Sequence, residues 1–473
     1  MRKTKIVLTA SLAALMLTHQ ASAQTVNPSD GTSAPEVTPA APKIPWDGFD
    51  LSWVNGNDRR DSSIFHMPYF TPSIMVDCNA THSFNNPIDH TVVGSTALSR
   101  NDEMVISAVN FGGDFTFGDA HARIMTQFGD RSQVVPRNDL SPYRGQYDLA
   151  DAYRYLDEAY AGYHFNVMYG INVDFGLFMS YIGLNSYYQQ ENWEYQASYT
   201  SDNTPWFFNG IRIQIFPSKY LKIEPWIING WQSYGMFNAL PGLGTNITWI
   251  PQERLKLLTN DYWGTDDAGL VGRHRFHSDN SFLYKYYSPK GKTTGITKMA
   301  FSMTGDVGFE QGDGVDGFKN GGPNNPAQYF VSWMVYNKIW FAKNHLGIYC
   351  GGGWMTNPGR YLVLEPTGQA SDLPNPYNPT TGASSLPSSQ QFTENPGQQF
   401  TGWDCSAGLS WMPNQSLEIK AEWVHREASV PYFAGPGGVT SPSGYTYTPL
   451  TPGWTPDLQR SESRVILAVE FRL

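Results

Sequence analysis

The sequence predicts an all-β protein, a closed antiparallel transmembrane β-barrel of roughly 16 strands within a range of about 12 to 18. Three observations lead to this prediction. Short segments alternate apolar and polar side chains, aromatic residues make up 14% of the chain, and charged residues make up only 16%. Soluble domains average about 25% charged residues. A barrel satisfies its backbone groups in lipid while keeping apolar residues at alternate positions, so it needs no long hydrophobic run.

The N-terminus predicts export. Basic residues between Arg2 and Lys5 precede an apolar run over residues 6–17, and Ala21-Ser22-Ala23 then supplies a small-residue cleavage pattern. This order is typical of a secretory signal peptide, which we expect over residues 1–23. No run of 18 apolar residues follows it, which excludes a helical membrane protein. We therefore expect the mature chain in the outer membrane of a Gram-negative bacterium.

The charge balance bears on the partners. The whole chain has a formal charge of −10, and without the three basic residues of the signal peptide 29 basic residues face 42 acidic ones. This acidic excess argues against a nucleic-acid partner. Three cysteines are an odd number without metal-ligand spacing, so neither a metal nor a cofactor is expected. A disulfide among Cys78, Cys350 and Cys405 stays open.

The chain divides into three predicted parts. After the signal peptide, residues 24–48 are rich in Pro, Ala and Thr, a composition that cannot build a core and predicts a flexible periplasmic arm. Residues 49–473 form the predicted barrel. Pro- and Gly-rich stretches at 357–399 and 428–462 predict long extracellular loops, because connections of this length are usually functional. One of them could fold inward as a constriction.

The alternation within the predicted strands is clear in several places. Ile211, Ile213 and Ile215 flank Arg212 and Gln214, and the segment 417–423 alternates in the same way. Side chains of a strand point to opposite faces, so such a segment presents one face to lipid and one to the lumen. A soluble β-sandwich alternates likewise. Tryptophans recurring at segment ends, as in membrane-interface girdles, weigh against a sandwich.

The last segment also favours a barrel. Val465, Leu467, Val469, Phe471 and Leu473 share one face of the final strand, and the chain stops there, so pairing with the first strand would remove the exposed edge. The segment 465–473 resembles the C-terminal signal by which outer-membrane proteins engage the barrel-assembly machinery, with Leu473 at the place of the usual Phe.

Seventeen alternating segments can be counted, one more than an even barrel of sixteen allows, so at least one of them is wrong. Their centres are Leu51, Met75, Ile106, Ile124, Ala159, Val173, Ile213, Ile223, Ile247, Leu257, Phe276, Met303, Val331, Ile348, Leu409, Ile419 and Val469.

A family resemblance lies in the middle of the chain, over residues 150–290. The ordered motifs that carry it are Tyr181-Ile182-Gly183-Leu184, Glu191-Asn192-Trp193, Thr204-Pro205-Trp206, Gly210-Ile211-Arg212, the stretch 226–231 ending in Asn229-Gly230-Trp231, and the polar run 273–279. This series resembles the OmpL-like β-barrel porin family of bacterial outer membranes. The resemblance implies a barrel that passes small solutes, and it brings no established substrate.

Charged residues at lumen-facing positions are the candidate pore lining. Arg273, Arg275, His277 and Asp279 share one face of a strand, where they could form a basic ladder that attracts anions or an ion network that braces the wall. The other candidates have mixed signs, so no ion preference is predicted. They are Arg212, Lys222, Glu224, Asp174, Asp306, Lys420 and Glu422.

The leading functional hypothesis is a porin for passive diffusion of small hydrophilic solutes. The sequence contains no nucleophile elbow, no zinc-protease motif and no phosphate-binding loop, so an enzyme is not expected. A non-conducting barrel acting as an adhesin or structural protein is the main alternative, and a hydrolase on the barrel rim is a further one. Expected partners are outer-membrane lipid, lipopolysaccharide and the solutes. A homotrimer, common among porins, stays open because no interface pattern is recognisable.

Overall fold

The computed structural model describes residues 43–60, 65, 67–136, 139, 146–267, 269–319, 327–359, 377–378, 383–384, 399–445, 448 and 453–473. The predicted signal peptide, most of the predicted arm and nearly all of the predicted loop 357–399 lie outside these residues. Of the predicted loop 428–462, residues 446–447 and 449–452 are likewise outside them.

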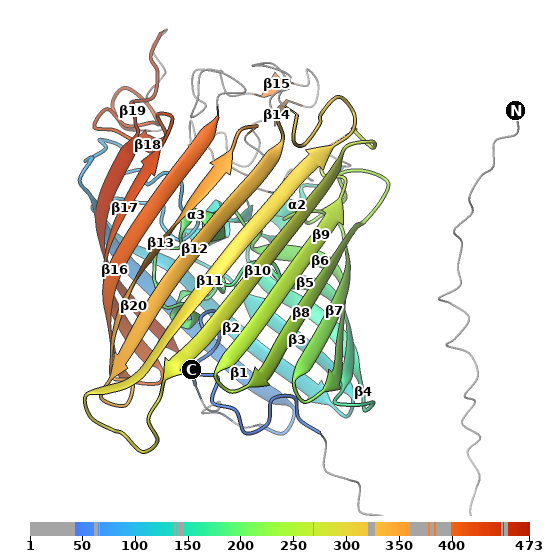
Figure 1. The fold of residues 1–473 in the computed structure, drawn as a ribbon. Coiled ribbons are helices and arrows are strands. Elements are labelled where there is room, and N and C mark those ends of the chain that lie inside the picture. Colours follow the sequence, from blue (N-terminus) through green and yellow to red (C-terminus); the bar gives the residue numbers. More distant parts are fainter. Residues whose placement is uncertain are drawn as a thin grey trace, which may run out of the picture. The chain divides into compact units, whose positions relative to one another are not determined.

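The described residues form a closed barrel of sixteen antiparallel strands (Figure 1). Each strand is hydrogen-bonded to the barrel strand before it and to the one after it along the chain. The predicted fold class is confirmed. The first eight strands are β1 Phe70–Ser83, β2 Met104–Phe117, β3 Ala120–Thr126, β4 Leu156–Phe165, β5 Ile171–Met179, β6 Phe207–Ser218, β7 Leu221–Ile228 and β8 Gly242–Gln252. The second eight are β9 Leu255–Gly264, β10 His274–Tyr287, β11 Ile296–Gln311, β12 Tyr329–Phe341, β13 Leu346–Asn357, β16 Phe400–Asn414, β17 Leu417–Ala428 and β20 Ser461–Arg472.

The ring closes between the first and last of these strands. β1 pairs with β20 from Met75 opposite Arg472 to Ser83 opposite Arg464. Ile74 and Leu473 extend the pairing by exchanging backbone hydrogen bonds. The edges of the sheet therefore disappear, which removes the unpaired backbone groups that an open sheet would expose.

The two ends of the barrel differ. At one end the strands are joined by short connections, such as Lys219 and Tyr220 between β6 and β7, and the C-terminus also lies there (Figure 1). We call this the short-turn end and the opposite one the long-loop end. Long connections at the latter include residues 84–103, 127–155 and 429–460. Two small hairpins also belong to long connections, β14 Tyr377–Asn378 with β15 Ala383–Ser384, and β18 Phe433–Ala434 with β19 Leu458–Gln459.

Short helices occur only within connections of the described chain. The β3–β4 connection contains α1 Arg131–Val134 and α2 Leu149–Tyr153, and the β5–β6 connection contains the 3₁₀ helix η3 Gln189–Glu191 and α3 Tyr199–Asp202. The Asp148 side chain caps α2 by accepting a hydrogen bond from the Asp151 backbone. In the described part of the chain, no helix is long and apolar enough to cross a membrane.

Alternation along the strands separates two environments. On β17, Glu418, Lys420 and Glu422 point inward and are buried, whereas Trp423 points outward and is 42% exposed. The same pattern holds on β20, where Leu467 is exposed and Ala468 is buried. The outer face is therefore largely apolar and the inner face polar, as expected of a wall between hydrocarbon and a lumen.

One of the seventeen predicted strands is wrong. Residues around Leu51 form turns rather than a strand, and β1 begins at Phe70. Each of the other sixteen predicted centres lies within a barrel strand. The three cysteines are free, and Cys350 and Cys405 lie on the outer face of β13 and β16, which leaves no disulfide among them.

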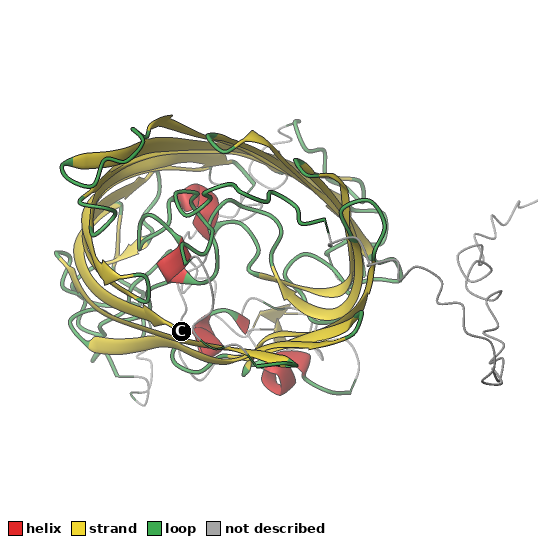
Figure 2. Ribbon diagram, turned by 90° about the horizontal axis from the view of Figure 1, so that it is seen from below, coloured by secondary structure: helices red, strands yellow, loops and turns green. Residues whose placement is uncertain are grey.

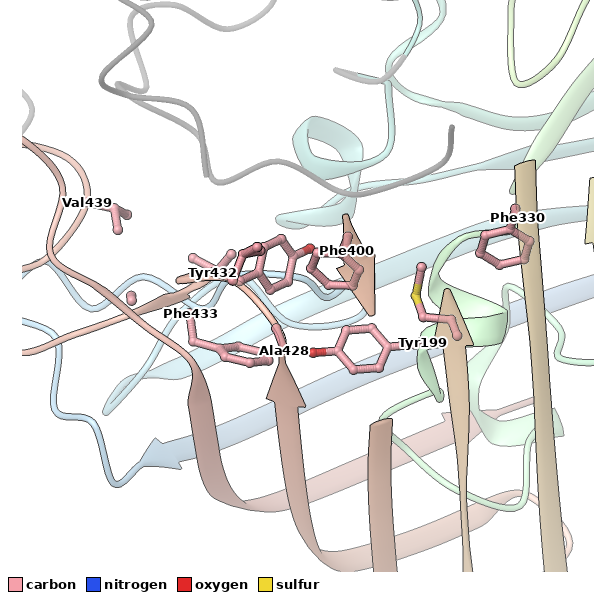
Figure 3. Close-up of a cluster of buried hydrophobic side chains, with 11 residues drawn as sticks. Tyr199, Phe330, Phe400, Ala428, Tyr432, Phe433 and Val439 are labelled. Atoms are coloured by element: carbon pink, nitrogen blue, oxygen red, sulfur yellow. The ribbon is translucent and has the colours of Figure 1, made fainter. Parts of the chain in front are cut away.

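One apolar cluster at the long-loop end joins strand ends to loops. Tyr199 of α3 lies beside Phe400 of β16 and Phe433 of β18, with ring centroids 6.0 and 6.5 Å apart, and Tyr432 packs against Phe400 (Figure 3). Phe330 and Val439 belong to the same buried cluster. The β17–β20 connection is thereby fixed against the rim rather than extended away from it.

A basic residue on the outer face should destabilise the barrel in lipid. Leu467 lies in the middle of β20, between Ala80 of β1 and Ala421 of β17, and its side chain is exposed. We expect Leu467→Arg to lower the free energy of unfolding from lipid vesicles by about 2–4 kcal/mol, because a charge would face hydrocarbon. Leu467→Ala is the control for lost packing. Equal destabilisation by both substitutions in denaturant titrations would contradict a lipid-facing position.

Candidate functional site

The β5–β6 connection, Ser180–Trp206, folds into the barrel instead of projecting from it. Residues 192–206 are all buried although they form no strand. Figure 2, viewed from the short-turn end, shows loops and short helices inside the ring of strands. We call this connection the inner loop. Its amino-acid sequence contains three acidic residues, Glu191, Glu194 and Asp202, and no lysine or arginine.

Carboxylates of the β16–β17 wall bind the backbone of the inner loop. Glu422 accepts hydrogen bonds from the backbone N–H groups of Tyr195 at 2.6 Å and Gln196 at 3.0 Å. Asp404 accepts one from the Tyr199 backbone at 2.9 Å and one from the Ser198 hydroxyl at 2.8 Å. A loop buried without strand partners needs such acceptors, because unpaired backbone N–H groups are costly away from water.

Cations of the same wall complete the contact. Lys420 donates to the backbone carbonyls of Gln189 and Asn192, both at 2.9 Å. Arg426 forms an ion pair with Asp202 at 2.7 Å and also donates to the Ala197 carbonyl. Arg472 of β20 pairs with Glu191. The acidic inner loop is therefore held by basic side chains of β17 and β20. The buried charged residues of β16 and β17, which we call the clamp, are Asp404, Glu418, Lys420, Glu422 and Arg426.

Arg426 also holds a second connection. Its guanidinium donates to the Gly94 carbonyl of the β1–β2 connection at 2.6 Å. The Asp202 carboxylate in turn accepts from Thr96 of that connection, at 2.9 Å from the hydroxyl. One buried ion pair thus joins the wall, the inner loop and the β1–β2 connection.

Residues 43–60, which precede β1, form an entry segment that lies against the inner loop. Trp53 is fully buried, and its indole donates to the Glu253 carbonyl in the β8–β9 turn at 3.0 Å. The Trp193 indole donates to the Trp53 carbonyl at 3.0 Å, and the Trp193 backbone donates to Asn55 at 2.7 Å. Arg59 pairs with Glu418 of β17. The entry segment therefore joins a turn of the short-turn end to the inner loop.

The opposite wall borders a polar cavity of about 420 Å³. Strands β2 to β6 and the β2–β3 turn supply its lining residues, which are Asp114, Phe115, Thr116, Gly118, Asp119, His121, Ala122, Tyr160, His164, Asn172, Asp174, Arg212 and Gln214. The side chain of Asp114 is 50% exposed, whereas those of Lys420 and Glu418 in the clamp are 0% exposed. The described lumen is thus solvent-accessible beside the short-turn halves of β2–β6 and packed along β16–β17.

An ion-pair network organises this cavity. Asp174 of β5 lies 2.8 Å from Arg212 of β6 and 2.5 Å from the His121 ring of β3. Arg123 of β3 lies 2.9 Å from Asp114 and 2.6 Å from Glu158. His164 contacts Asn172, which donates to Gln214 at 3.1 Å. Both signs of charge and several amide groups therefore face one water-accessible space.

Aromatic rings surround the Arg212 side of the cavity. The Arg212 guanidinium carbon lies 4.7 Å from the Tyr160 ring centroid, 4.6 Å from that of Phe178 and 5.8 Å from that of Trp226. Phe178 and Trp226 are buried together with Phe208 and Tyr262. Rings stacked on a guanidinium stabilise it and fix its position, so Arg212 is a rigid cation at the boundary between cavity and packed lumen.

The predicted pore-lining residues separate into three groups. Asp174, Arg212, Lys222 and Glu224 lie on β5–β7, with Lys222 2.9 Å from Glu224, and two of them, Asp174 and Arg212, line the cavity. Lys420 and Glu422 belong to the clamp. The interior side of β10–β11 and the loop before it carry the third group, Arg273, Arg275, His277, Asp279 and Asp306.

The third group is an ion network rather than an uninterrupted basic row. Arg273 precedes β10 and pairs with Asp267, and Arg275 pairs with Glu310 at 2.7 Å. His277 lies 3.6 Å from Asp306, which is directly opposite Asp279 in the strand register. Whether these residues face a conducting path stays a prediction. Among the described residues, no group of His, Cys, Asp or Glu side chains is arranged to hold a metal ion.

Sequence reasoning missed the inner loop and much of the cavity. The inner loop was recognised only as a family motif, although its acidic, lysine-free composition opposite basic strand positions is a detectable signal. His121, His164 and Asn172 are absent from the predicted pore lining, because apart from His277 only Asp, Glu, Lys and Arg were chosen for it. The inward fold occurs in Ser180–Trp206, to which no constriction was assigned.

A closed sixteen-stranded barrel with a polar interior and an inward-folded connection has the architecture of a β-barrel porin. The model of the family described as "Putative beta-barrel porin-2, OmpL-like" matches residues 69–448. The chain belongs to this family, as its resemblance predicted. No curated protein matches the chain.

Several solved structures are similar in fold. OmpT of Vibrio cholerae has 8% sequence identity and a TM-score of 0.45, with 87% of this chain and 100% of that chain covered. DcaP, an outer membrane channel of Acinetobacter baumannii, has 10% identity and a TM-score of 0.46, with 85% and 97% covered. An anion-selective porin from Comamonas acidovorans has 8% identity and a TM-score of 0.45, with 85% and 99% covered. These similarities are too low to carry an argument about the function of the chain.

The entry segment should be held in part by Asp50. Its carboxylate lies 2.9 Å from the Lys298 ammonium and accepts from the Ser52 hydroxyl at 2.6 Å. Burial alone would raise the pKa of Asp50, but Lys298, Ser52 and Lys285 outweigh it and lower the pKa to about 2. Because the folded pKa is lowered from 3.8, this contribution is fully present above about pH 4 and is lost as the pH falls through about 2.

We therefore expect Asp50→Asn to increase proteolytic cleavage within residues 43–60 at neutral pH, with the barrel intact. The difference from the unsubstituted protein should disappear near pH 2, measured with an acid-active protease. Asp47→Asn, an exposed residue of the same segment, is the matched control. Equal cleavage of all three proteins at pH 7 would show that the Asp50–Lys298 contact does not hold the segment.

Proposed function

We propose that this protein is an outer-membrane porin that passes small hydrophilic solutes along the β2–β6 side of its lumen. The observation that carries the proposal is the polar, water-accessible cavity on that side, opposite a lumen wall packed by the inner loop. Mixed charges and amides suit hydrated solutes of either sign, and they do not suit an apolar ligand. The proposed role is transport, without catalysis.

The orientation follows from the loop lengths. Outer-membrane barrels carry short periplasmic turns and longer extracellular loops. In this proposal the short-turn end therefore faces the periplasm, together with the entry segment, and the long-loop end faces outside. The cavity then opens toward the periplasm, and the inner loop narrows the path between it and the extracellular loops.

Planar-bilayer recording tests the proposal directly. Purified protein, shown to be folded by its heat-dependent mobility in gels, should give stepwise conductance in potassium chloride. A folded protein that inserts into vesicles but gives no steps would overturn the porin proposal and favour a sealed adhesin or structural barrel.

The cavity charge should influence ion selectivity. Asp114 is half-exposed at the cavity, so Asp114→Asn removes a negative charge from the proposed path. We expect the reversal potential under a potassium chloride gradient to shift toward anions. Glu427→Gln, an equally exposed carboxylate on the outer face of β17, should leave it unchanged. The same reversal potential in all three proteins would mean that ions do not pass beside Asp114.

The clamp should limit the conductance. Arg426→Met removes the partner of the buried Asp202 carboxylate, and breaking such a pair typically costs about 3–5 kcal/mol. We expect the inner loop to become mobile, which should give larger and noisier conductance steps while the gel mobility still shows a folded barrel. Its sequence neighbour Glu427 again supplies the control, as Glu427→Gln. Unaltered steps in Arg426→Met would show that the inner loop does not restrict the path.

A further inference from the structure

A cluster of polar side chains lies on the outer face of the barrel, in the middle of β8, β9 and β10. Thr245, Asp261 and Ser278 are opposite one another in the strand register, and Thr259 and Asn280 form the adjacent row. Gly305 of β11 continues the second row, opposite Asn280. We call these six residues the polar face.

The positions around the polar face are apolar or aromatic. On β9 the outward residues on either side are Leu257 and Trp263, and on β10 they are Phe276 and Phe282. Outward positions of the neighbouring β6 and β7 are mostly isoleucine and leucine, such as Ile211 and Ile223. The polar face therefore interrupts an otherwise apolar outer wall, one outward position inside Trp263 and Phe276.

The carboxylate of Asp261 is poorly compensated within the chain. Among the described residues it accepts one hydrogen bond, a long one of 3.4 Å from the Thr245 hydroxyl. Among the described residues, no lysine or arginine forms an ion pair with it. A carboxylate facing hydrocarbon is costly, and intramembrane ionisable residues normally face protein or water.

The other side chains of the polar face carry hydrogen-bond donors. Thr259 donates to Asn280 at 2.6 Å, and the Asn280 amide donates one hydrogen to Ser278 at 3.0 Å. An amide has two N–H groups, so a second remains to be directed outward. Gly305 leaves a shallow dent beside Asn280, since a Cβ there would meet nothing nearer than the Ser332 carbonyl at 3.9 Å. Small residues of this kind let another protein backbone approach closely in a membrane.

We propose that the polar face is the contact through which a second copy of this chain associates in the membrane. A second copy fits because the polar face is self-complementary. It contains a carboxylate that accepts only one long hydrogen bond among the described residues, and amide and hydroxyl donors that can supply more. In a symmetric contact, Asp261 of each copy accepts from the Asn280 and Ser278 region of the other, and both carboxylates leave the hydrocarbon. The proposal rests on the membrane location proposed above.

Site-specific cross-linking tests this contact in the native envelope. In full-length protein with Cys78, Cys350 and Cys405 replaced by Ala, Asn280→Cys should give a disulfide-linked dimer band upon mild oxidation of outer membranes. Ile213→Cys, an outward position on β6, is the matched control and should remain monomeric. Cross-linking of Asn280→Cys at or below the level of Ile213→Cys would overturn the proposal.

A second variant separates association from folding. Asp261→Leu with Asn280→Leu should reduce the mass of the protein in mild detergent from an oligomer to a monomer, while gel mobility and bilayer conductance persist. An oligomer that survives this change, or a protein without substitutions that is monomeric, would refute the contact and leave a lipid headgroup or another protein opposite Asp261. Recovery of the chain in the aqueous fraction would instead refute the membrane location.

Discussion

The structure depends on ring closure between β1 and β20. Hydrocarbon offers no partner to a backbone N–H or carbonyl, so a spanning sheet is stable there only when its two edges bond to each other. The register from Met75 opposite Arg472 to Ser83 opposite Arg464 achieves this along nearly the whole of β20. Closure also creates an interior, and that interior must either hold water or be filled by the chain itself.

This chain does both, on different sides. Along β16–β17 the inner loop occupies the space, and acidic loop residues meet basic wall residues such as Arg426 and Arg472. The desolvation of these charges is offset by ion pairs and by hydrogen bonds to loop backbone, as burial of charge requires. Along β2–β6 the wall carries His121, Asn172 and Arg212 beside an accessible cavity. The asymmetry of the lumen follows from where the loop's partners lie.

The barrel was predictable because every strand alternates outward apolar residues with inward polar residues. Sixteen predicted strand centres lie in strands since one face of each must be apolar, whatever its neighbours are. The error at Leu51 has the same origin. Phe49, Leu51 and Trp53 alternate with Asp50 and Ser52 as a strand would. However, Asp50 bonds to Lys298, and Trp53 bonds to Glu253 and to the inner loop, so no adjacent strand pairs with this segment. Alternation shows only that the two faces of a segment lie in different environments. A segment that packs inside a lumen can meet this condition without being a strand.

The lumen was less predictable. Alternation along the strands identified the face on which Lys420, Glu422 and Arg212 lie. The groups that these side chains contact in the lumen, however, depend on how a connection far away in the sequence folds. Glu422 is 226 to 227 residues from the backbone amides that it binds. No local pattern encodes such a pairing, so side chains of the same kind became a clamp on one wall and a cavity lining on the other.

The bond between Trp193 and Trp53 has a mechanical consequence. It connects the inner loop to the entry segment, which also contacts the β8–β9 turn at the short-turn end through the Trp53 indole. A pull on the entry segment is therefore transmitted to the inner loop through the Trp53 carbonyl and the Trp193 indole, without any strand having to slide against its neighbour.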